Sequence, residues 1–320
     1  MDEGSSMRIL KPLVVSALAV VILAMTAQSV TASSADEDAL RKCDELAASS
    51  LDDQRTAPAV YSIPPEAIEW CERAHRAYPE NGRIFFQKSL IGRELRDPTL
   101  VDDMLKVIEL GHDAGYAVLG RIAKKSRQEV GGYSYDDLLK IGLEKGMSWA
   151  LYDRGKWYEE GRDKPPEQEY PTPHYETALE FYERAAAKGY SAGELAAGSL
   201  YYIGFMGKDK DTRWQGVPYF VRAAKMGDPM GAYLAGKAYL DGSVVEQDIE
   251  KGLDYYLEAY LGSGTGSMFV VNDLLWRAKE TEMQVKHKIW QTLCEDSDTE
   301  DFDVKAYFKF LQKDDFDCGS

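Results

Sequence analysis

A glycine frame recurs three times in the middle of the chain and constrains the fold more than any other feature. In each copy a second glycine follows the first by nine residues, and a tyrosine and a third glycine follow at intervals of three. The copies are Gly146, Gly155, Tyr158 and Gly161; Gly189, Gly198, Tyr201 and Gly204; and Gly227, Gly236, Tyr239 and Gly242. A worn copy begins with Gly111 and Gly120. Such recurrence predicts stacked structural repeats, because a single small unit cannot bury a core alone.

The segments between the copies are amphipathic and end on glycine, as "YETALEFYERAAAKG" and "WQGVPYFVRAAKMG" show. This pattern is typical of helices, so each unit is a helix pair of about 36 residues. A glycine inside a helix costs about 1 kcal/mol relative to alanine. The second glycine of each copy therefore indicates a close crossing with the partner helix. The tyrosine that follows is expected to fill the neighbouring groove, which places Tyr158, Tyr201 and Tyr239 in the core.

The segments "GELAAGSLYYIG", "GAYLAGKAYLDG" and "PYFVRAAKMG" resemble Sel1-like repeats, which are relatives of the tetratricopeptide repeat. The resemblance covers residues 99–280 in its broad form. It implies an all-α fold, a right-handed α/α solenoid of helix pairs with a concave binding face. Two insertions, "DKPPEQEYPTPH" and "MGKDKDTRW", interrupt the units, so loop contacts of the family are not carried over.

In this family the first helix of each pair lines the concave face, and the resemblance supplies the register of the positions exposed there. The candidate partner-binding residues are Arg121, Lys124, Trp149, Tyr152, Lys156, Tyr202, Tyr233 and Lys237. Aromatic residues and arginine are the types that carry interface energy. We therefore expect an acidic, extended segment of a partner protein in this groove; the alternative is a groove that is merely solvated.

The first 32 residues differ from the rest of the chain. Arg8 and Lys11 precede an apolar run from Leu13 to Met25, and small residues precede Ser33. The run is short for a bilayer core of about 30 Å. A signal peptide over residues 1–32, with Met7 as the true start and cleavage before Ser33, is therefore favoured over an uncleaved anchor.

Four cysteines follow the export signal: Cys43, Cys71, Cys294 and Cys318. Four cysteines allow three connectivities, and their positions favour one disulfide at each end of the chain. Residues 33–98 resemble an N-terminal module that precedes such repeats in exported bacterial proteins, with Cys43 and Cys71 at its two cysteine positions; a degenerate tetratricopeptide unit is the alternative. Residues 281–320 are expected to form two capping helices and an acidic tail.

No pattern in the sequence predicts catalysis, a metal site or a cofactor. The four histidines share no ligand spacing, "GSGTGS" at 262–267 lacks the strand and lysine of a phosphate loop, and "EDSDTEDFD" at 295–303 lacks the glycine and glutamate of a calcium loop. The formal net charge of −16 argues against nucleic-acid binding.

These observations and the resemblance predict a non-catalytic scaffold, adaptor or regulator that binds proteins in the periplasm or after secretion. The alternative is a module that binds cell-wall glycan or accompanies a hydrolase. A third interpretation is a surface or host-directed factor.

Overall fold

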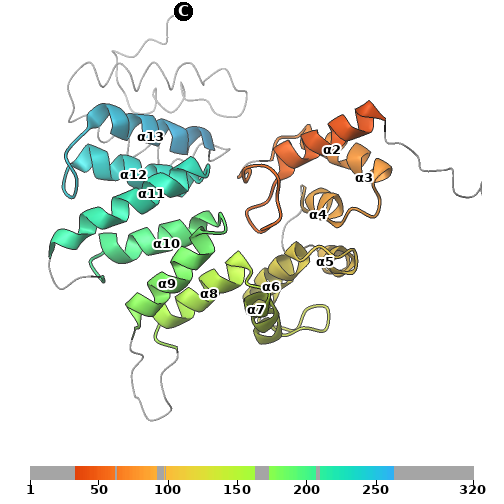
Figure 1. Ribbon diagram of the computed structural model, residues 1–320, viewed down its shortest axis with the longest axis horizontal. Coiled ribbons are helices and arrows are strands. Elements are labelled where there is room, and N and C mark those ends of the chain that lie inside the picture. Colours follow the sequence, from red (N-terminus) through yellow and green to blue (C-terminus); the bar gives the residue numbers. More distant parts are fainter. Residues whose placement is uncertain are drawn as a thin grey trace, which may run out of the picture.

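The computed structural model describes residues 33–61, 63–91, 97, 99–162, 173–206 and 210–262, and the chain within these ranges is built from helices and loops. The α-helices are α2 (Ser34–Ala47), α3 (Ala67–Ala77), α4 (Gly82–Leu90), α5 (Thr99–Glu109), α6 (Ala114–Ser126), α7 (Tyr135–Glu144), α8 (Ser148–Glu159), α9 (Tyr175–Ala186), α10 (Ser191–Tyr202), α11 (Val217–Lys225), α12 (Pro229–Asp241) and α13 (Ile249–Gly262). A 3₁₀ helix, η1 (Lys210–Gly216), precedes α11. Each helix packs mainly on its neighbours in the chain, and the helices follow a curved path from α2 to α13 (Figure 1). The all-α solenoid predicted from the repeats is confirmed.

Helices α2, α3 and α4 form the N-terminal module, and the sequence sets their boundaries locally. The side chain of Ser33 accepts a hydrogen bond from the backbone N–H of Asp36, whose carboxylate accepts one from the N–H of Ser33, so a capping box starts α2. Asn81 caps α4 in the same manner, through the N–H groups of Arg83 and Ile84. The small core of this module is lined by Ala39, Cys43, Ala47, Ala67, Cys71, Ala74 and Ile84.

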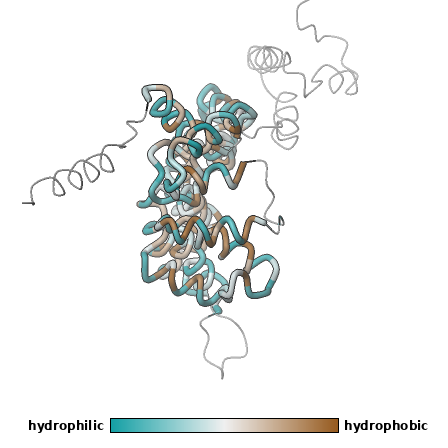
Figure 2. The backbone as a smooth tube through the Cα atoms, turned by 90° about the vertical axis from the view of Figure 1, so that its right-hand side faces the viewer, coloured by the Kyte–Doolittle hydropathy of each residue, from teal (hydrophilic) through white to brown (hydrophobic). Residues whose placement is uncertain are grey.

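Glycine allows close crossing inside each helix pair, as predicted. A Cβ atom at Gly155 of α8 would lie 2.6 Å from the ring of Tyr182 in α9. The corresponding distance is 2.7 Å from Gly198 to Phe220, and 2.4 Å from Gly236 to Tyr256. Real Cβ atoms do not approach other atoms so closely. The glycine therefore leaves the space that one aromatic ring of the partner helix fills. Figure 2 shows hydrophilic and hydrophobic positions alternating along single helices, as this packing requires.

The tyrosine of each frame lies nearer the surface than we predicted. Tyr158, Tyr201 and Tyr239 are half-buried. Each stacks on a second aromatic ring, with centroids 5.5, 5.7 and 6.1 Å apart. The fully buried rings are instead Tyr182, Phe220 and Tyr256. The expectation of a core position is thus wrong, because the ring that enters the crossing comes from the second helix of the pair.

Several predictions fall outside the described residues. These are the signal peptide at 1–32, the C-terminal segment 281–320, the Cys294–Cys318 disulfide and the acidic segment 295–303; they stay predictions. Among the helices that the structure describes, none is long and apolar enough to cross a membrane.

Candidate protein-binding surface

Two of the residues predicted to face a partner are buried, which corrects their assignment. Trp149 is 3% exposed, because its ring fills the space left by two glycines on neighbouring helices. A Cβ atom at Gly120 or at Gly142 would lie 2.8 Å from that ring. Tyr233 is 7% exposed, with its ring centroid 5.3 Å from that of Tyr256. Both side chains belong to the core.

Two other predicted aromatic residues are half-buried and keep an edge at the surface. Tyr152 of α8 lies between Tyr182 and Tyr190, each with a ring centroid 5.6 Å away. Burial raises the pKa of the Tyr152 hydroxyl, and the carboxylates of Asp153 and Glu159 add to this rise. Tyr202 meets the ring of Phe220 edge-on at 5.5 Å. Both tyrosine rings thus pack against other aromatic rings and keep part of their surface exposed.

Carboxylates of α8 form ion pairs with two of the four predicted cations, one on α6 and one on α8. Lys124 Nζ lies 2.7 Å from Asp153 Oδ1, and Lys156 Nζ lies 3.1 Å from Glu159 Oε2. Arg121 is exposed and Lys237 is half-buried. The surface along α6, α8 and α12 therefore carries both signs of charge, whereas we expected a cationic groove.

A loop from the N-terminal module contacts the repeats, which sequence reasoning missed. This docking loop, described at residues 48–61 and 63–66, lies between α2 and α3 in the chain and extends toward the repeats (Figure 1). A backbone hydrogen bond within the loop joins its two arms: the N–H of Val60 donates to the carbonyl oxygen of Ala48 at 2.8 Å. Its Leu51 is 5% exposed and shares one hydrophobic cluster with Trp149 and Tyr190. The loop is thus anchored in the core of the repeats.

The first polar contact of the docking loop is a buried group around His112, just before α6. Asp52 is 0% and His112 is 5% exposed. The imidazole Nε2 of His112 lies 3.3 Å from Asp52 Oδ2, and its Nδ1 lies 2.9 Å from Gln54 Oε1. Both ring nitrogens therefore face oxygen atoms of the loop.

The second contact supplies a cap for α8. The helix has Met147 at its N-cap, which makes no side-chain cap hydrogen bond. Asp53 of the loop takes that role: its Oδ2 accepts from the backbone N–H of Ser148 at 2.7 Å, and its Oδ1 accepts from the Ser148 hydroxyl. A carboxylate distant in sequence thus satisfies an N–H group that the helix leaves free.

The third and fourth contacts involve the starts of α10 and α12. Arg55 Nη2 donates to the carbonyl oxygen of Gly189 at 2.6 Å. The Tyr61 hydroxyl lies 2.5 Å from Ser191 Oγ, which donates to Asp228 Oδ2 at 2.6 Å. Burial is the main reason that the pKa of Tyr61 rises to about 12. The loop backbone also approaches Gly227, where a Cβ atom would lie 3.7 Å from the carbonyl oxygen of Ala59.

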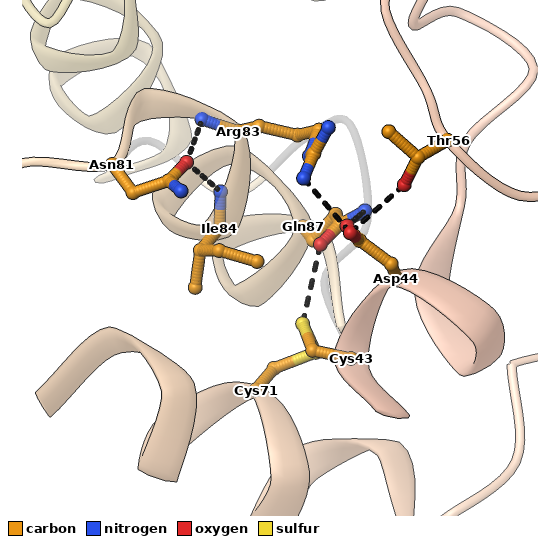
Figure 3. Close-up of a disulfide and its surroundings, with 8 residues drawn as sticks. All are labelled: Cys43, Asp44, Thr56, Cys71, Asn81, Arg83, Ile84 and Gln87. Atoms are coloured by element: carbon orange, nitrogen blue, oxygen red, sulfur yellow. Dashed lines mark hydrogen bonds and ion pairs between the residues drawn. A yellow bond between two sulfur atoms is a disulfide. The ribbon is translucent and has the colours of Figure 1, made fainter. Parts of the chain in front are cut away.

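A disulfide and a buried carboxylate hold the base of the docking loop (Figure 3). The predicted Cys43–Cys71 bond is present, and it closes a sequence separation of 28 residues that contains the whole loop. Asp44 Oδ2 accepts from Thr56 of the loop and from Arg83 Nη2, each at 2.8 Å. The module thus fixes the two ends of the loop, and the repeats hold its middle.

The contact points lie at the start of four copies of the glycine frame. Each lies at the first glycine of a copy or within two residues after it, and the worn copy is included. The contacted residues are His112, Ser148, Gly189, Ser191 and Gly227. One signal in the sequence pointed to the loop: connections longer than about 12–15 residues are uncommon and often functional. The length alone did not say where the loop docks.

Comparisons with known proteins found distant structural neighbours. No protein-family model matches the chain, and no curated protein matches its sequence. A Sel1 repeat protein from Oxalobacter formigenes is 21% identical, with a TM-score of 0.42 over 63% of this chain and 77% of that chain. An immunity protein from Pseudomonas aeruginosa is 16% identical, with a TM-score of 0.49 over 72% and 83%.

A protective antigen with an SLR fold, present in uropathogenic Escherichia coli strains, is 16% identical, with a TM-score of 0.31 over 77% of this chain and 67% of that chain. At these scores the overlays give no residue-level correspondence, so the contacts above come from this chain alone. In its recurring glycine frame and its stacked helix pairs, the chain is similar to Sel1-like repeat proteins.

Proposed function

We propose that this chain is a non-catalytic scaffold or adaptor that holds a partner protein along its stacked repeats. One observation carries the proposal: three successive copies of the frame already hold an irregular polypeptide segment, the docking loop, by hydrogen bonds at or just after their first glycine, and the loop backbone approaches the fourth copy at Gly227. A surface that binds one such segment through side-chain and backbone hydrogen bonds has the chemistry to bind another. Within the described ranges, no group of three or more His, Cys, Asp or Glu side chains is placed to hold a metal ion.

The proposed partner site is the surface of α6, α8, α10 and α12 next to the docking loop. It uses those predicted residues that stay at least partly exposed, which are Arg121, Lys124, Tyr152, Lys156, Tyr202 and Lys237. Tyr190, at the start of α10, connects this surface with the loop. Burial raises the pKa of Tyr190 to about 12, while Arg121 opposes the rise and Asp53 adds to it. The charges of Arg121 and Asp53 are therefore both close enough to Tyr190 to change the pKa of its hydroxyl.

The proposed location is the periplasm or the medium. The apolar segment at 13–25 behind two cations supports export, and a disulfide in the mature chain fits an oxidising compartment. N-terminal sequencing of the secreted protein tests this: Ser33 is the expected first residue. Recovery of residues 8–25 in the exported chain would reject cleavage.

Capture of partners by immobilised protein tests the function. We expect a specific partner protein from periplasmic extract, whereas retention on purified peptidoglycan alone would favour the glycan alternative. The double variant Lys156→Glu with Lys237→Glu should weaken capture at least tenfold.

A matched control for that variant exists in the chain. Lys106 and Glu109 of α5 form an ion pair at 3.2 Å with the same spacing as Lys156 and Glu159. The variant Lys106→Glu with Lys140→Glu reverses two exposed charges on α5 and α7, and it should leave capture unchanged. Equal capture by both folded variants would place the partner elsewhere.

A further inference from the structure

The docking loop brings carboxylates to the site proposed for an acidic partner. Its sequence, "SSLDDQRTAPAVYS", carries two adjacent aspartates. Asp53 binds the start of α8 through Ser148 and lies within electrostatic reach of Tyr190. The ring of Tyr190 in turn contacts Tyr152, with centroids 5.6 Å apart. An acidic segment of this chain thus already occupies one border of the proposed partner site.

We propose that the docking loop is a built-in occupant of the partner site, and that an acidic segment of the partner competes with it for the same groups. A carboxylate of the partner competes with Asp53 for the N–H and hydroxyl of Ser148. Donor groups beside that carboxylate compete with Arg55 and Tyr61 for the carbonyl oxygen of Gly189 and the hydroxyl oxygen of Ser191. This inference rests on the proposed scaffold function for its partner. The contacts between loop and repeats stand independently of it.

The first residues of the loop are buried against the repeats, and several of the residues after them are more exposed. Leu51 and Asp52 are buried, whereas Tyr61 is 39% exposed. After Asp52, the loop reaches the repeats through polar contacts of Asp53, Arg55 and Tyr61. Water or another peptide can replace these contacts. The segment from Asp53 to Tyr61 can therefore leave the helix ends while Leu51 stays in the core.

The loop competes as part of the same chain, and the Cys43–Cys71 disulfide shortens its tether. Because the disulfide joins the two ends of the loop, the released segment stays close to its binding site. A tethered segment acts at an effective concentration in the millimolar range for a short flexible tether. A partner segment must therefore bind more tightly than the loop, which restricts access to partners that match the site well.

A peptide made from the loop itself tests the proposal without the natural partner. The probe is a fluorescein-labelled peptide of residues 48–63, titrated into the full mature chain with its disulfide intact. The open-loop variant carries Asp53→Ala, Arg55→Ala and Tyr61→Phe. These substitutions remove the side-chain hydrogen bonds of the loop to Ser148, Gly189 and Ser191. We expect the peptide to bind this variant at least tenfold more tightly than the wild type. A control peptide with Asp52→Asn and Asp53→Asn should bind at least tenfold more weakly.

Equal peptide affinity for wild type and variant, or no binding to either, overturns the proposal if the variant keeps the circular dichroism spectrum of the wild type. If the triple variant does not fold, the milder Arg55→Ala with Tyr61→Phe variant replaces it, and the same titration decides. Hydrogen exchange gives a second readout: the amide of Ser148, which donates to Asp53, should exchange faster in the open-loop variant and regain protection with the peptide. A loop that is only structural would show the faster exchange without the recovery.

The partner assay separates this inference from the proposed function. If the wild type captures a partner and the open-loop variant captures no more of it, competition by the loop fails while the scaffold stands. If the peptide binds the open-loop variant but neither protein captures a partner, the loop occupies a real site and the scaffold function fails.

Discussion

The N-terminal module and the repeats are both made of short helices, but different forces hold them together. In the module, Ser33 and Asn81 cap two of the three helices, and a disulfide joins the other end of α2 to α3. In the repeats, a glycine opposite an aromatic ring sets each crossing, and α8 and α10 begin without a side-chain cap of their own. The module is therefore specified by local signals and a covalent bond. The repeats are specified by steric fit between helices.

The difference also explains how the two regions depend on each other. The docking loop carries Asp53 from the module to the uncapped start of α8. Through Arg55 and Tyr61 it also reaches the carbonyl of Gly189 and the side chain at the start of α10. The module thus supplies polar partners that the repeats lack. The comparison leads to three predictions.

Removal of the disulfide should have the largest effect. The variant Cys43→Ser with Cys71→Ser should lose about 3 kcal/mol of unfolding free energy, because the unfolded chain regains the freedom of a 28-residue loop. Hydrogen exchange should show the loss first in α2 and α3, while the amides of α12 keep their protection. Equal loss of protection in both regions would mean that the module and the repeats unfold as one unit.

Replacement of a crossing glycine should affect the repeats instead. The Cβ atom in Gly198→Leu would lie 2.7 Å from the ring of Phe220 and 3.0 Å from the carbonyl oxygen of Gly216. Overpacking of this kind costs about 1–3 kcal/mol, and we expect the upper end because one of the two atoms is backbone. Urea unfolding measures the loss.

The matched control for this variant is Glu180→Leu, an exposed position of α9 in the neighbouring crossing. It should stay within about 0.5 kcal/mol of the wild type. A similar cost for both substitutions would show that added apolar surface, and not the close crossing, destabilises the chain.

The sequence predicted those parts of the fold that depend on local spacing. The glycine of each frame, the helix pairs and the Cys43–Cys71 bond were predicted correctly because each follows from spacing or from the resemblance of short segments. The sequence did not predict which way single aromatic rings point. Trp149 was assigned to the partner face, but it turns inward because Gly120 and Gly142, on two other helices, leave room for its ring. Such room depends on neighbours distant in the chain.

The docking loop shows the same limit for the candidate site. Its Tyr61 and Ser191 are 130 residues apart, and Asp53 and Ser148 are 95 apart. No periodicity links such pairs. The sequence therefore offered no prediction of what the loop contacts, although the frame positions that it touches were already visible as a repeat. Long-range polar contacts are decided by the packed fold, and the packed fold was needed to find them.

The smallest expected effect concerns two capping boxes, which offer the same chemistry in the two regions. Ser33 starts α2 in the module, and Ser134 starts α7 in the first part of the repeats. Replacing either serine by alanine should cost about 1 kcal/mol, because one helix N–H group loses its acceptor. Urea unfolding at neutral pH should give similar losses. A much smaller loss for Ser33→Ala would mean that the start of α2 frays before the chain unfolds.

The pH dependence of the two boxes sharpens this last comparison. Hydrogen bonds from the side chain and the backbone of Ser33 hold the pKa of Asp36 below its ordinary value of 3.8, and Ser134 does the same for Asp137. Because the folded pKa is lowered, the stabilisation is fully present above pH 3.8 and is lost as the pH falls through the folded pKa. The difference between the wild type and each serine variant should therefore shrink in acid, in both regions alike. A difference that stays constant as the carboxylates become protonated would show that the serine hydroxyl stabilises the helix without help from the aspartate. The box would then be a simple N-cap.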